Sequence, residues 1–367
     1  MFSGFYRGQR ILVTGHTGFK GGWLSLWLES LGAEVHGFSL YELDRPSLYE
    51  ALPRNLFASE TEGDVRDPAA LKAALNRVDP NLIFHLAAQP LVRASYDDPI
   101  ATVTANTMGS VRVLEALRET GCPASIVVVT TDKCYENRNL DRGYKETDPL
   151  GGHDPYSASK AAAEILTHAW RRSFFETDSS LGRVATARGG NVIGGGDYAV
   201  DRIVPDLVRA RQTETALEIR NPAATRPWQH ALDCLSGYLT LGARLVLEPD
   251  NSDLGGAFNF GPDARSNRTV RELVEQAAKT WPGEATFPEL GGQPHEATLL
   301  NLCSDRAAQI LDWVPVWSFE ESVNKTIQWY RKRHEGSASE IAAFSMQQIE
   351  EYGARARVRN LTWAIEE

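Results

Sequence analysis

The sequence has little cysteine and no long apolar run. Its 4 cysteines lie far apart among 367 residues and form no Cys-x-x-Cys pair, so we expect no metal site. A disulfide framework is not expected in an intracellular chain of this length. No apolar stretch approaches the roughly 20 residues that span a bilayer, and the first residues lack the apolar core of a signal peptide. We therefore expect a cytoplasmic protein.

The chain also has fewer positively charged than negatively charged residues. Lys and Arg total 38 against 48 Asp and Glu, which gives a formal net charge of −10. Nucleic acids and anionic membranes attract basic surfaces, so this balance argues against both as partners. It leaves room for a small phosphorylated ligand that a few local arginines could hold. Hydrophobic residues make up 42% of the chain, which is enough for one large or two modest cores.

Strand and helix patterns alternate through the first half of the chain. Apolar runs such as RILVTG (10–15) and SIVVVTT (125–131) indicate buried strands, and segments with helical spacing lie between them. This alternation predicts parallel βαβ units, and so an α/β fold with a Rossmann-like doubly wound parallel sheet. After about Asn191, shorter elements and turns rich in glycine and proline predict a smaller mixed α/β substrate domain.

These patterns predict three parts along the chain. A Rossmann domain covers residues 1–190, and 228–262 is expected to return to it because GGAFNFG has the pattern of another strand. The substrate domain takes 191–227 and 263–335. A polar helical tail, 336–367, is expected to pack at the periphery.

A glycine-rich turn follows the first strand. In VTGHTGFKG, Gly15, Gly18 and Gly21 have G-x-x-G-x-x-G spacing before the first helix. Glycine permits a tight turn and a close approach of the backbone to a pyrophosphate, which then lies at the positive end of the helix. An ordinary glycine-rich loop is the alternative. The position of the turn within a βαβ series favours a dinucleotide site.

The end of the second strand does not decide which dinucleotide binds. NAD enzymes usually carry an acid there for the ribose hydroxyls. This chain has Ser39 instead, and Glu42, Asp44 and Arg45 come later. NAD and NADP therefore both remain open at this position.

Later strand ends add further candidates for cofactor binding. Asp64 and Val65 follow the third strand pattern as a candidate adenine contact, with a polar loop as the equal alternative. Ala87 and Ala88 are small enough to leave room for a cofactor. His85, just before them, is expected to be a core histidine rather than a catalyst.

A tyrosine, a lysine and a threonine form the candidate catalytic set. Tyr156 and Lys160 are four residues apart at a helix start, so they share one helical face. An ammonium beside a phenol favours the phenolate and lowers its pKa from about 10 towards neutrality. Thr131 ends an intervening strand. A Tyr-x-x-x-Lys pair alone could be a surface contact, but the order of the three elements is more specific.

At this point the chain resembles the extended short-chain dehydrogenase/reductase superfamily, over residues 8–330. Within it, the chain is most similar to the CDP-glucose branch of the nucleotide-sugar dehydratases. That likeness rests on six segments: VTGHTGFKGGWLSLWL, HLAAQPLVR, TTDKCYEN, PYSASKAAAE, GGNVIGGGD and RPWQH. It implies a tightly held NAD and conversion of CDP-D-glucose to CDP-4-keto-6-deoxy-D-glucose plus water. The family supplies deoxysugars for bacterial surface polysaccharides such as lipopolysaccharide O-antigen.

The resemblance also implies catalytic roles. Tyr156 would take the C4 hydroxyl proton while hydride leaves C4, and the hydride later returns to C6. Asp132 would protonate the departing C6 hydroxyl, and Lys133 would remove the C5 proton, where related dTDP-glucose enzymes have Asp-Glu. Lys133 can act as a base only if its pKa falls towards neutrality, so Glu136 is the reserve candidate. The structural alternative is that Asp132 caps a turn and Lys133 points to solvent.

The remaining site residues come from the same resemblance. Arg226 is the preferred diphosphate ligand, because a guanidinium matches phosphate in a bidentate manner. The cofactor residues are expected to be Gly15, Thr17, Gly18, Phe19, Gly21, Ser39, Asp64, Val65, Leu86, Ala87, Ala88, Asn106, Tyr156 and Lys160. The substrate residues are expected to be Gln89, Arg93, Asn191, Arg202, Arg226, His295 and Glu296.

The resemblance implies a homodimer through helices near 99–119 and 157–173, with a tetramer as the alternative. Three other functions fit the same scaffold. An epimerase, or a dehydratase for another nucleotide sugar, would share the Tyr-Lys pair, but an epimerase needs no acid at Asp132. An NADP-dependent reductase would consume free cofactor. A non-enzymatic NAD(P)-sensing regulator need not retain the catalytic set.

Overall fold

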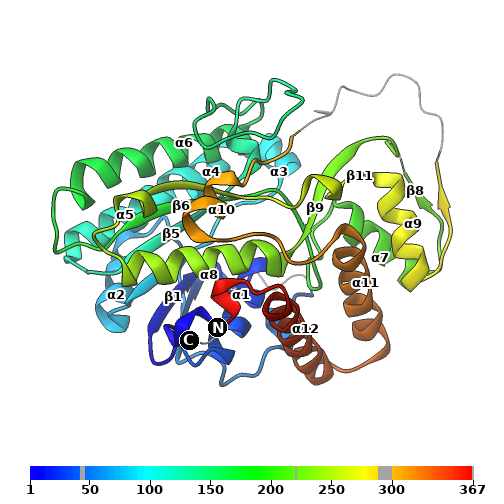
Figure 1. Ribbon diagram of the computed structural model, residues 1–367, viewed down its shortest axis with the longest axis horizontal. Helices are drawn as coiled ribbons and strands as arrows, with labels where there is room; N and C mark the ends of the chain where they lie inside the picture. The colour runs from blue at the N-terminus through cyan, green and yellow to red at the C-terminus, as the bar shows by residue number, and fades with distance from the viewer. Residues whose placement is uncertain (42–45, 220, 288–299, 366–367) are drawn as a thin grey trace.

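The computed structural model describes residues 1–41, 46–219, 221–287 and 300–365. Its largest sheet has seven strands in the order β10-β6-β5-β4-β1-β2-β3, and every neighbouring pair is parallel (Figure 1). This confirms the predicted α/β, doubly wound fold. The strands are β1 (Arg10–Thr14), β2 (Glu34–Ser39), β3 (Ser59–Glu62), β4 (Leu82–His85), β5 (Ser125–Thr131), β6 (Val184–Gly189) and β10 (Gly256–Phe260).

Helices cover both faces of this sheet. All seven residues of β5 are buried, because alternate side chains enter two different cores. Ile126 and Val128 face α2 and α5, whereas Val127 and Val129 face α1 and α8. These helices, with α6 beside α5 in Figure 1, are α1 (Phe19–Ser30), α2 (Pro68–Val78), α5 (Gly109–Thr120), α6 (Pro155–Trp170) and α8 (Ala231–Leu247).

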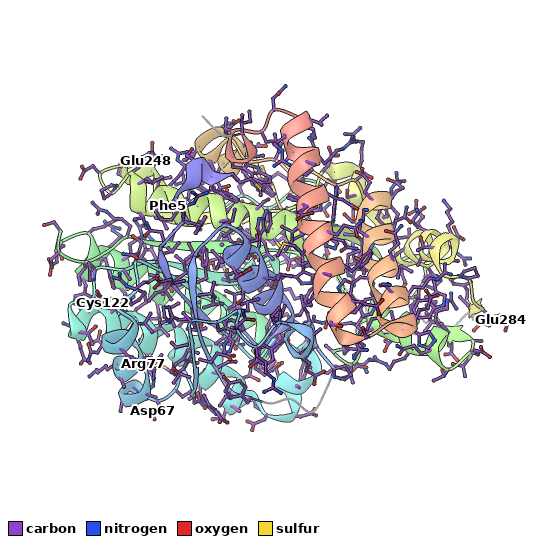
Figure 2. The ribbon with its side chains drawn as sticks, turned by 90° about the horizontal axis from the view of Figure 1, so that it is seen from below. Phe5, Asp67, Arg77, Cys122, Glu248 and Glu284 are labelled. Carbon is purple, nitrogen blue, oxygen red and sulfur yellow. The ribbon has the colours of Figure 1, made fainter. Side chains whose placement is uncertain are left out.

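The helix α2 shows how local sequence sets an element boundary. Asp67 caps it by accepting hydrogen bonds from the backbone N–H groups of Ala69 and Ala70. Pro68 occupies the first helical position, where its missing N–H costs nothing. Figure 2 labels Asp67 and Arg77 towards the two ends of this helix. The basic Arg77 lies in the last turn, where it complements the helix dipole.

The order of the strands predicts a ligand-binding crevice outside the carboxyl ends of β1 and β4. The chain runs outward from β1 to β2 and β3, then crosses to β4 on the other side of β1. In open α/β sheets, ligands bind at this reversal, outside the carboxyl ends of the strands. The loop after β4 is tied to β1 there, since Ala87 N donates to Thr14 Oγ1 over 3.3 Å. The glycine-rich turn and this loop therefore border the same crevice.

The later part of the chain adds a smaller set of elements beside the main sheet. A three-stranded sheet has the order β11-β9-β7, and β12 pairs with β8. Figure 1 shows β9 and β11 on the side of α7, α9 and α11. The strands are β7 (Asn191–Ile193), β8 (Leu217–Glu218), β9 (Thr225–His230), β11 (Asn267–Thr269) and β12 (Ala285–Thr286). The other helices are α3 (Val92–Asp97), α4 (Pro99–Val103), α7 (Ile203–Gln212), α9 (Val270–Thr280), α10 (Asp305–Leu311), α11 (Phe319–Glu335) and α12 (Ala338–Val358).

Aromatic side chains join the C-terminal residues to the core. Tyr352 of α12 is fully buried and packs edge-on against Trp27 of α1, and Trp363 stacks on Phe2 with ring centroids 5.2 Å apart. Figure 2 shows the N-terminal segment at Phe5 lying against α8. The expected peripheral helix therefore contributes directly to the main core. None of the helices in the described ranges is long and apolar enough to span a membrane.

A buried carboxylate lies under α12. Asp233, in the first turn of α8, accepts hydrogen bonds through Oδ1 from Tyr352 Oη at 2.9 Å and Val316 N at 2.7 Å. Its Oδ2 is buried without a hydrogen-bond partner among the described residues. Burial raises the pKa of Asp233 to about 6. The charged form is therefore disfavoured at this position.

Asp233 should make the stability of the protein depend on pH. An unfolded aspartate titrates near pH ~4, so the folded state holds this proton more tightly. The resulting stabilisation is fully present below pH ~4 and is lost as pH rises to about 6. Asp233→Asn, whose carbonyl can still accept both hydrogen bonds, should lack this loss and exceed the wild type by about 1–3 kcal/mol at neutral pH. Urea denaturation across this pH range measures the difference. Equal pH slopes for the two proteins would contradict it, and Asp206→Asn on α7 is the surface control.

Candidate functional site

The glycine-rich turn fits a bound pyrophosphate. Gly15 has a φ of +75°, and a Cβ there would lie 2.7 Å from Ala87 N. A Cβ on Gly21 would lie 2.1 Å from the Gly15 carbonyl oxygen, so neither position accepts a side chain. Gly18 is the N-cap of α1 and provides no side-chain cap. The first N–H groups of α1 are thus available to an anion at the positive end of the helix.

The structure brings two predicted cofactor residues together at the end of β2. Thr17 Oγ1 lies 2.8 Å from Ser39 Oγ, so the two hydroxyls form a pair beside the turn. Phe19, the first residue of α1, lies against Gly194, where a Cβ would be 3.0 Å from the ring. Glu42, Asp44 and Arg45, the other candidates near this position, lie outside the described residues.

The candidates after β3 have structural partners. Asp64 accepts bidentate hydrogen bonds from Arg66, including 2.8 Å from Nε to Oδ2. This hydrogen bonding lowers the pKa of Asp64. Val65 is buried, and its side chain fills the space beside Gly109. The contact of Asp64 and Val65 with the adenine stays a prediction.

The loop after β4 is held by buried amides. Leu86 N donates to the Thr14 carbonyl at 3.0 Å, which fixes the start of the loop with Ala87 and Ala88. Asn106 accepts from Gln89 N at 2.7 Å and donates to Gln89 O and Ser159 Oγ. It therefore joins the loop to α6. As a cofactor contact, Asn106 stays a prediction.

Gln89 is also engaged within the loop. Its amide group donates to Thr102 Oγ1 at 2.8 Å and to Leu91 O at 3.0 Å, and its oxygen accepts from Leu91 N. These bonds position the loop. The contact of Gln89 with the sugar stays a prediction. His85 bonds Thr14 Oγ1 at 2.7 Å and Ser110 Oγ at 3.1 Å. Burial lowers its pKa to about 3, which fits a neutral core histidine.

The end of β5 holds a buried acid. Thr131 Oγ1 donates to Asp132 Oδ1 at 2.9 Å and accepts from Lys133 N at 3.3 Å. Thr131 therefore caps the turn, rather than Asp132 as the structural alternative supposed. Asp132 is 2% exposed, and its Oδ2 has no hydrogen-bond partner in the part of the chain that the structure describes. Burial raises its pKa, which keeps the carboxyl group in its protonated form to higher pH.

Tyr156 lies at the start of α6, where Asp154 caps the helix and Pro155 is its first residue. The tyrosine is buried, and burial raises its pKa to about 12. The interaction with Thr131 lowers this pKa, but by less. The expected lowering by Lys160 is therefore wrong for this structure, because loss of solvation of the phenolate outweighs the other effects. The structure nevertheless places Tyr156 close enough to Thr131 and Asp132 for both to affect its pKa.

Lys160 reaches back to the sheet from the same face of α6. Its Nζ donates to the Val129 carbonyl oxygen at 3.2 Å, which fixes α6 against β5. Burial, and then the positive charge of Lys20, lowers the pKa of Lys160 to about 8. Two lysines therefore share this site, and only Lys160 was expected from the Tyr-x-x-x-Lys pattern.

The two candidate bases differ in their surroundings. Lys133 is partly buried beside Asp132. Burial raises the pKa of Asp132, and the charge of Lys133 opposes this with a smaller effect. Its side chain forms no hydrogen bond or ion pair with any residue in the described ranges. Glu136 is exposed and pairs with Arg138 at 2.7 Å. Lys133 is therefore nearer to the acid and has its amine free of a structural ion pair.

The predicted substrate residues come from the second part of the chain. Arg202 precedes α7 and pairs with Asp197 at 2.7 Å, and its charge also acts on Tyr156. Arg226 lies in β9 opposite Arg268 of β11, and its charge acts on Asp132. Asn191 begins β7, next to β9. These three elements therefore converge on the end of β5.

Two further predictions differ in their outcome. Arg93, in the first turn of α3, pairs with Asp201 at 2.6 Å, and its side chain is 68% exposed. This pair links α3 to the segment that carries Arg202. His295 and Glu296 lie outside the described residues.

Sequence reasoning missed three residues near the catalytic set. Lys20 Nζ lies 3.4 Å from Tyr238 Oη, which comes from α8. Gln229 is buried near Asp132, since a Cβ on Gly190 would lie 3.3 Å from Asp132 Oδ2 and 3.9 Å from Gln229 Nε2. The segments GFKG and RPWQH contain Lys20 and Gln229. The available signal for Lys20 was a lysine directly after the glycine-rich turn, at the start of the apolar segment GGWLSLWL.

The arrangement combines a dinucleotide cradle with acid–base groups. Tyr156 can exchange a proton with a substrate hydroxyl once it is ionised, and Asp132 can donate a proton from a protected position. Arginines at the opposite side of the crevice can hold a diphosphate. The site thus fits hydride transfer coupled to loss of a hydroxyl group.

Comparisons with known proteins agree with this geometry. The family model described as GDP-mannose 4,6 dehydratase matches residues 12–326. CDP-glucose 4,6-dehydratase of Salmonella typhimurium is 42% identical over 332 residues, which cover 89% of this chain and 92% of that protein. UDP-glucose 4-epimerase of Thermus thermophilus, solved with NAD, has a TM-score of 0.75 at 23% identity and covers 88% of this chain and 99% of its own. The dTDP-glucose 4,6-dehydratase of Bacillus anthracis, also with NAD, has a TM-score of 0.73 at 21% identity, with 89% and 98% covered.

Proposed function

Because the chain belongs to the family described as GDP-mannose 4,6 dehydratase, we propose that it is a CDP-glucose 4,6-dehydratase. This hydro-lyase converts CDP-D-glucose to CDP-4-keto-6-deoxy-D-glucose and water. The similarity to the Salmonella protein supports CDP-glucose as the substrate. The observation that carries the proposal is the buried Asp132 beside Tyr156, whose Oδ2 has no hydrogen-bond partner among the described residues, because dehydration needs an acid that simple dehydrogenation does not.

The glycine turn and the loop after β4 are the residues that would hold NAD. Bound NAD supplies the hydride acceptor for C4 and the hydride donor for C6, so the reaction has no net oxidation. The uncapped N-terminus of α1 would face the pyrophosphate, with Thr17 and Ser39 beside it. Lys160 would contact the nicotinamide ribose while it holds α6 against β5. Asp64 and Val65 would lie at the adenine end.

Tyr156 acts on the C4 hydroxyl in this proposal. The phenolate removes the hydroxyl proton as hydride leaves C4, which gives a 4-ketone. Thr131 lies beside Tyr156 and lowers its pKa, so it favours the reactive form. The charge of Arg202 acts in the same direction. Hydride removal should therefore become faster as pH rises.

Asp132 and its neighbour perform the elimination. The ketone makes the C5 hydrogen acidic, and Lys133 removes it as Asp132 protonates the departing C6 hydroxyl. Burial keeps Asp132 protonated to higher pH, which suits a general acid. Glu136 is the less favoured base, because it is exposed and already paired with Arg138.

The nucleotide end is proposed to lie between the Rossmann domain and the segments 191–227 and 263–335. Arg226 would bind the diphosphate, supported by Arg202 and Asn191. Arg93 would close the entrance through its pair with Asp201. The return of β10 to the main sheet and the position of α8 beneath it support assigning 228–262 to the Rossmann domain.

A homodimer is proposed, with a tetramer as the alternative. Large apolar side chains are exposed on α3, α4 and α6, among them Tyr96 at 62%, Ile100 at 77% and Ile165 at 55%. Such a concentration of exposed apolar surface is typical of an interface. A cytoplasmic location also stays a prediction from the sequence.

Incubation with nucleotide sugars tests the proposed function. Purified protein given CDP-glucose and NAD, without reductant, should form a product lighter by one water, as measured by mass spectrometry. Parallel incubations with UDP-glucose, dTDP-glucose and GDP-mannose test the base and the sugar. A product of unchanged mass but altered stereochemistry would instead identify an epimerase. Turnover of another nucleotide sugar with none of CDP-glucose would overturn the substrate assignment.

A further inference from the structure

Lys20 lies in the first turn of α1, directly after the phosphate-binding turn, and its side chain extends to α8. Its Nζ is 3.4 Å from Tyr238 Oη and 5.5 Å from the centre of that ring. A Cβ on Gly189, at the end of β6, would lie 4.0 Å from the same nitrogen. The amine is therefore held where the glycine turn, β6 and α8 meet, between the cofactor cradle and the catalytic groups.

The positive charge of Lys20 has no ion-pair partner among the residues that the structure describes. Its hydrogen-bond partner is a hydroxyl group, which does not neutralise it. Burial lowers the pKa of Lys20, and this effect outweighs the opposite influence of Asp132. The charge still acts on the catalytic groups, because it lowers the pKa of Lys160.

We propose that Lys20 sets the relative affinity of this site for the two oxidation states of NAD and favours the reduced form. The inference rests on the proposed NAD-dependent function but not on the identity of the sugar. Oxidised NAD has a cationic nicotinamide ring, whereas the ring of NADH is neutral, and both carry the same pyrophosphate. The ring must lie near Tyr156, because hydride leaves the carbon whose hydroxyl Tyr156 deprotonates. A cation held beside this position repels only the oxidised ring.

A role in phosphate binding makes a different prediction. A lysine that anchored the pyrophosphate would attract NAD and NADH equally, so its loss would weaken both by the same factor. The amine instead contacts Tyr238 of α8, and its charge acts on Lys160 of the catalytic set. The ratio of the two affinities therefore separates the two roles.

Binding measurements on protein freed of dinucleotide test the proposal. Titration calorimetry gives the Kd for NAD and for NADH in the wild type and in Lys20→Met, which removes the charge but keeps an unbranched side chain. The ratio Kd(NAD)/Kd(NADH) should fall by about tenfold in the variant. Lys20→Arg keeps the charge and should keep the wild-type ratio. Lys72→Met removes a surface lysine of α2 that pairs with Glu119, and should also leave the ratio unchanged.

The possible results divide clearly. An unchanged ratio in Lys20→Met, or an equal loss of affinity for both forms, would overturn the proposal. Thermal melting checks that each variant is folded, and Lys20→Gln replaces Lys20→Met in the same titrations if the latter unfolds. If the wild type binds neither NAD nor NADH, the proposed function fails rather than this inference.

Discussion

Asp132→Asn should slow the loss of water from the substrate by about 100-fold or more, while removal of hydride from C4 remains detectable. Asparagine matches the carboxyl group in shape and can still accept the hydrogen bond from Thr131 Oγ1. It has no acidic proton for the departing C6 hydroxyl. The buried Oδ2 of Asp132 lacks a hydrogen-bond partner among the described residues.

Single-turnover experiments separate the two steps. Mixing the variant and NAD with CDP-glucose should give an accumulation of NADH absorbance, because the intermediate cannot lose water. In the wild type, the rate of water loss should fall as pH rises through the raised pKa of Asp132, since only the protonated acid donates. The variant should lack this decline. Asp206→Asn, at a half-exposed position of α7 that pairs with Arg209, is the matched control and should behave as wild type. An equal loss of both steps would indicate a structural role for Asp132.

Tyr156→Phe should reduce hydride transfer from C4 by about 10²–10⁴-fold, because phenylalanine retains the ring and removes the base. Binding of NAD and of the sugar nucleotide should change little, since the ring still fills its buried position. Burial raises the pKa of Tyr156 to about 12, so the phenolate is scarce at neutral pH. The wild-type rate of hydride transfer should therefore rise with pH, opposite in direction to the effect of Asp132.

NADH absorbance in a single turnover with CDP-glucose measures the effect of Tyr156→Phe. Tyr96→Phe, at an exposed position of α3, is the matched control and should leave the rate unchanged. If Tyr156→Phe transfers hydride at the wild-type rate, another residue must act as the base. If the affinity for NAD falls as much as the rate, the tyrosine serves mainly to hold the cofactor.

Local sequence was sufficient to predict the main elements of the fold. SIVVVTT is buried on both sides in β5, and the glycine spacing of the first turn has a direct steric reason in Gly15 and Gly21. Such features depend on residues close together in the chain. They also place Asp132 and Tyr156 correctly, because a strand end and a helix start are local signals.

Side-chain electrostatics could not be predicted in the same way. The pKa of Tyr156 depends on how deeply the folded protein buries it, and no spacing reveals this. Lys20 and Tyr238 lie 218 positions apart in the sequence, so their contact arises only when α8 packs beneath the sheet. Gln89 was expected to face the sugar, but its bonds to Thr102 and Leu91 become visible only in the folded loop.

In the proposed function, proton transfer and nucleotide recognition use different sheets of this protein. Asp132 and Tyr156 are placed by β5 and α6. The buried Glu164 of α6 accepts a hydrogen bond from Thr130 of β5 and pairs with Arg188 of β6 at 2.8 Å, which fastens the helix to both strands. Arg226 instead belongs to the small sheet of β7, β9 and β11. Laboratory evolution of the preference for one nucleobase could therefore be confined to that small sheet and its flanking loops. A library of variants at these positions would change how the nucleotide part of the substrate is bound, while the reacting groups keep their positions.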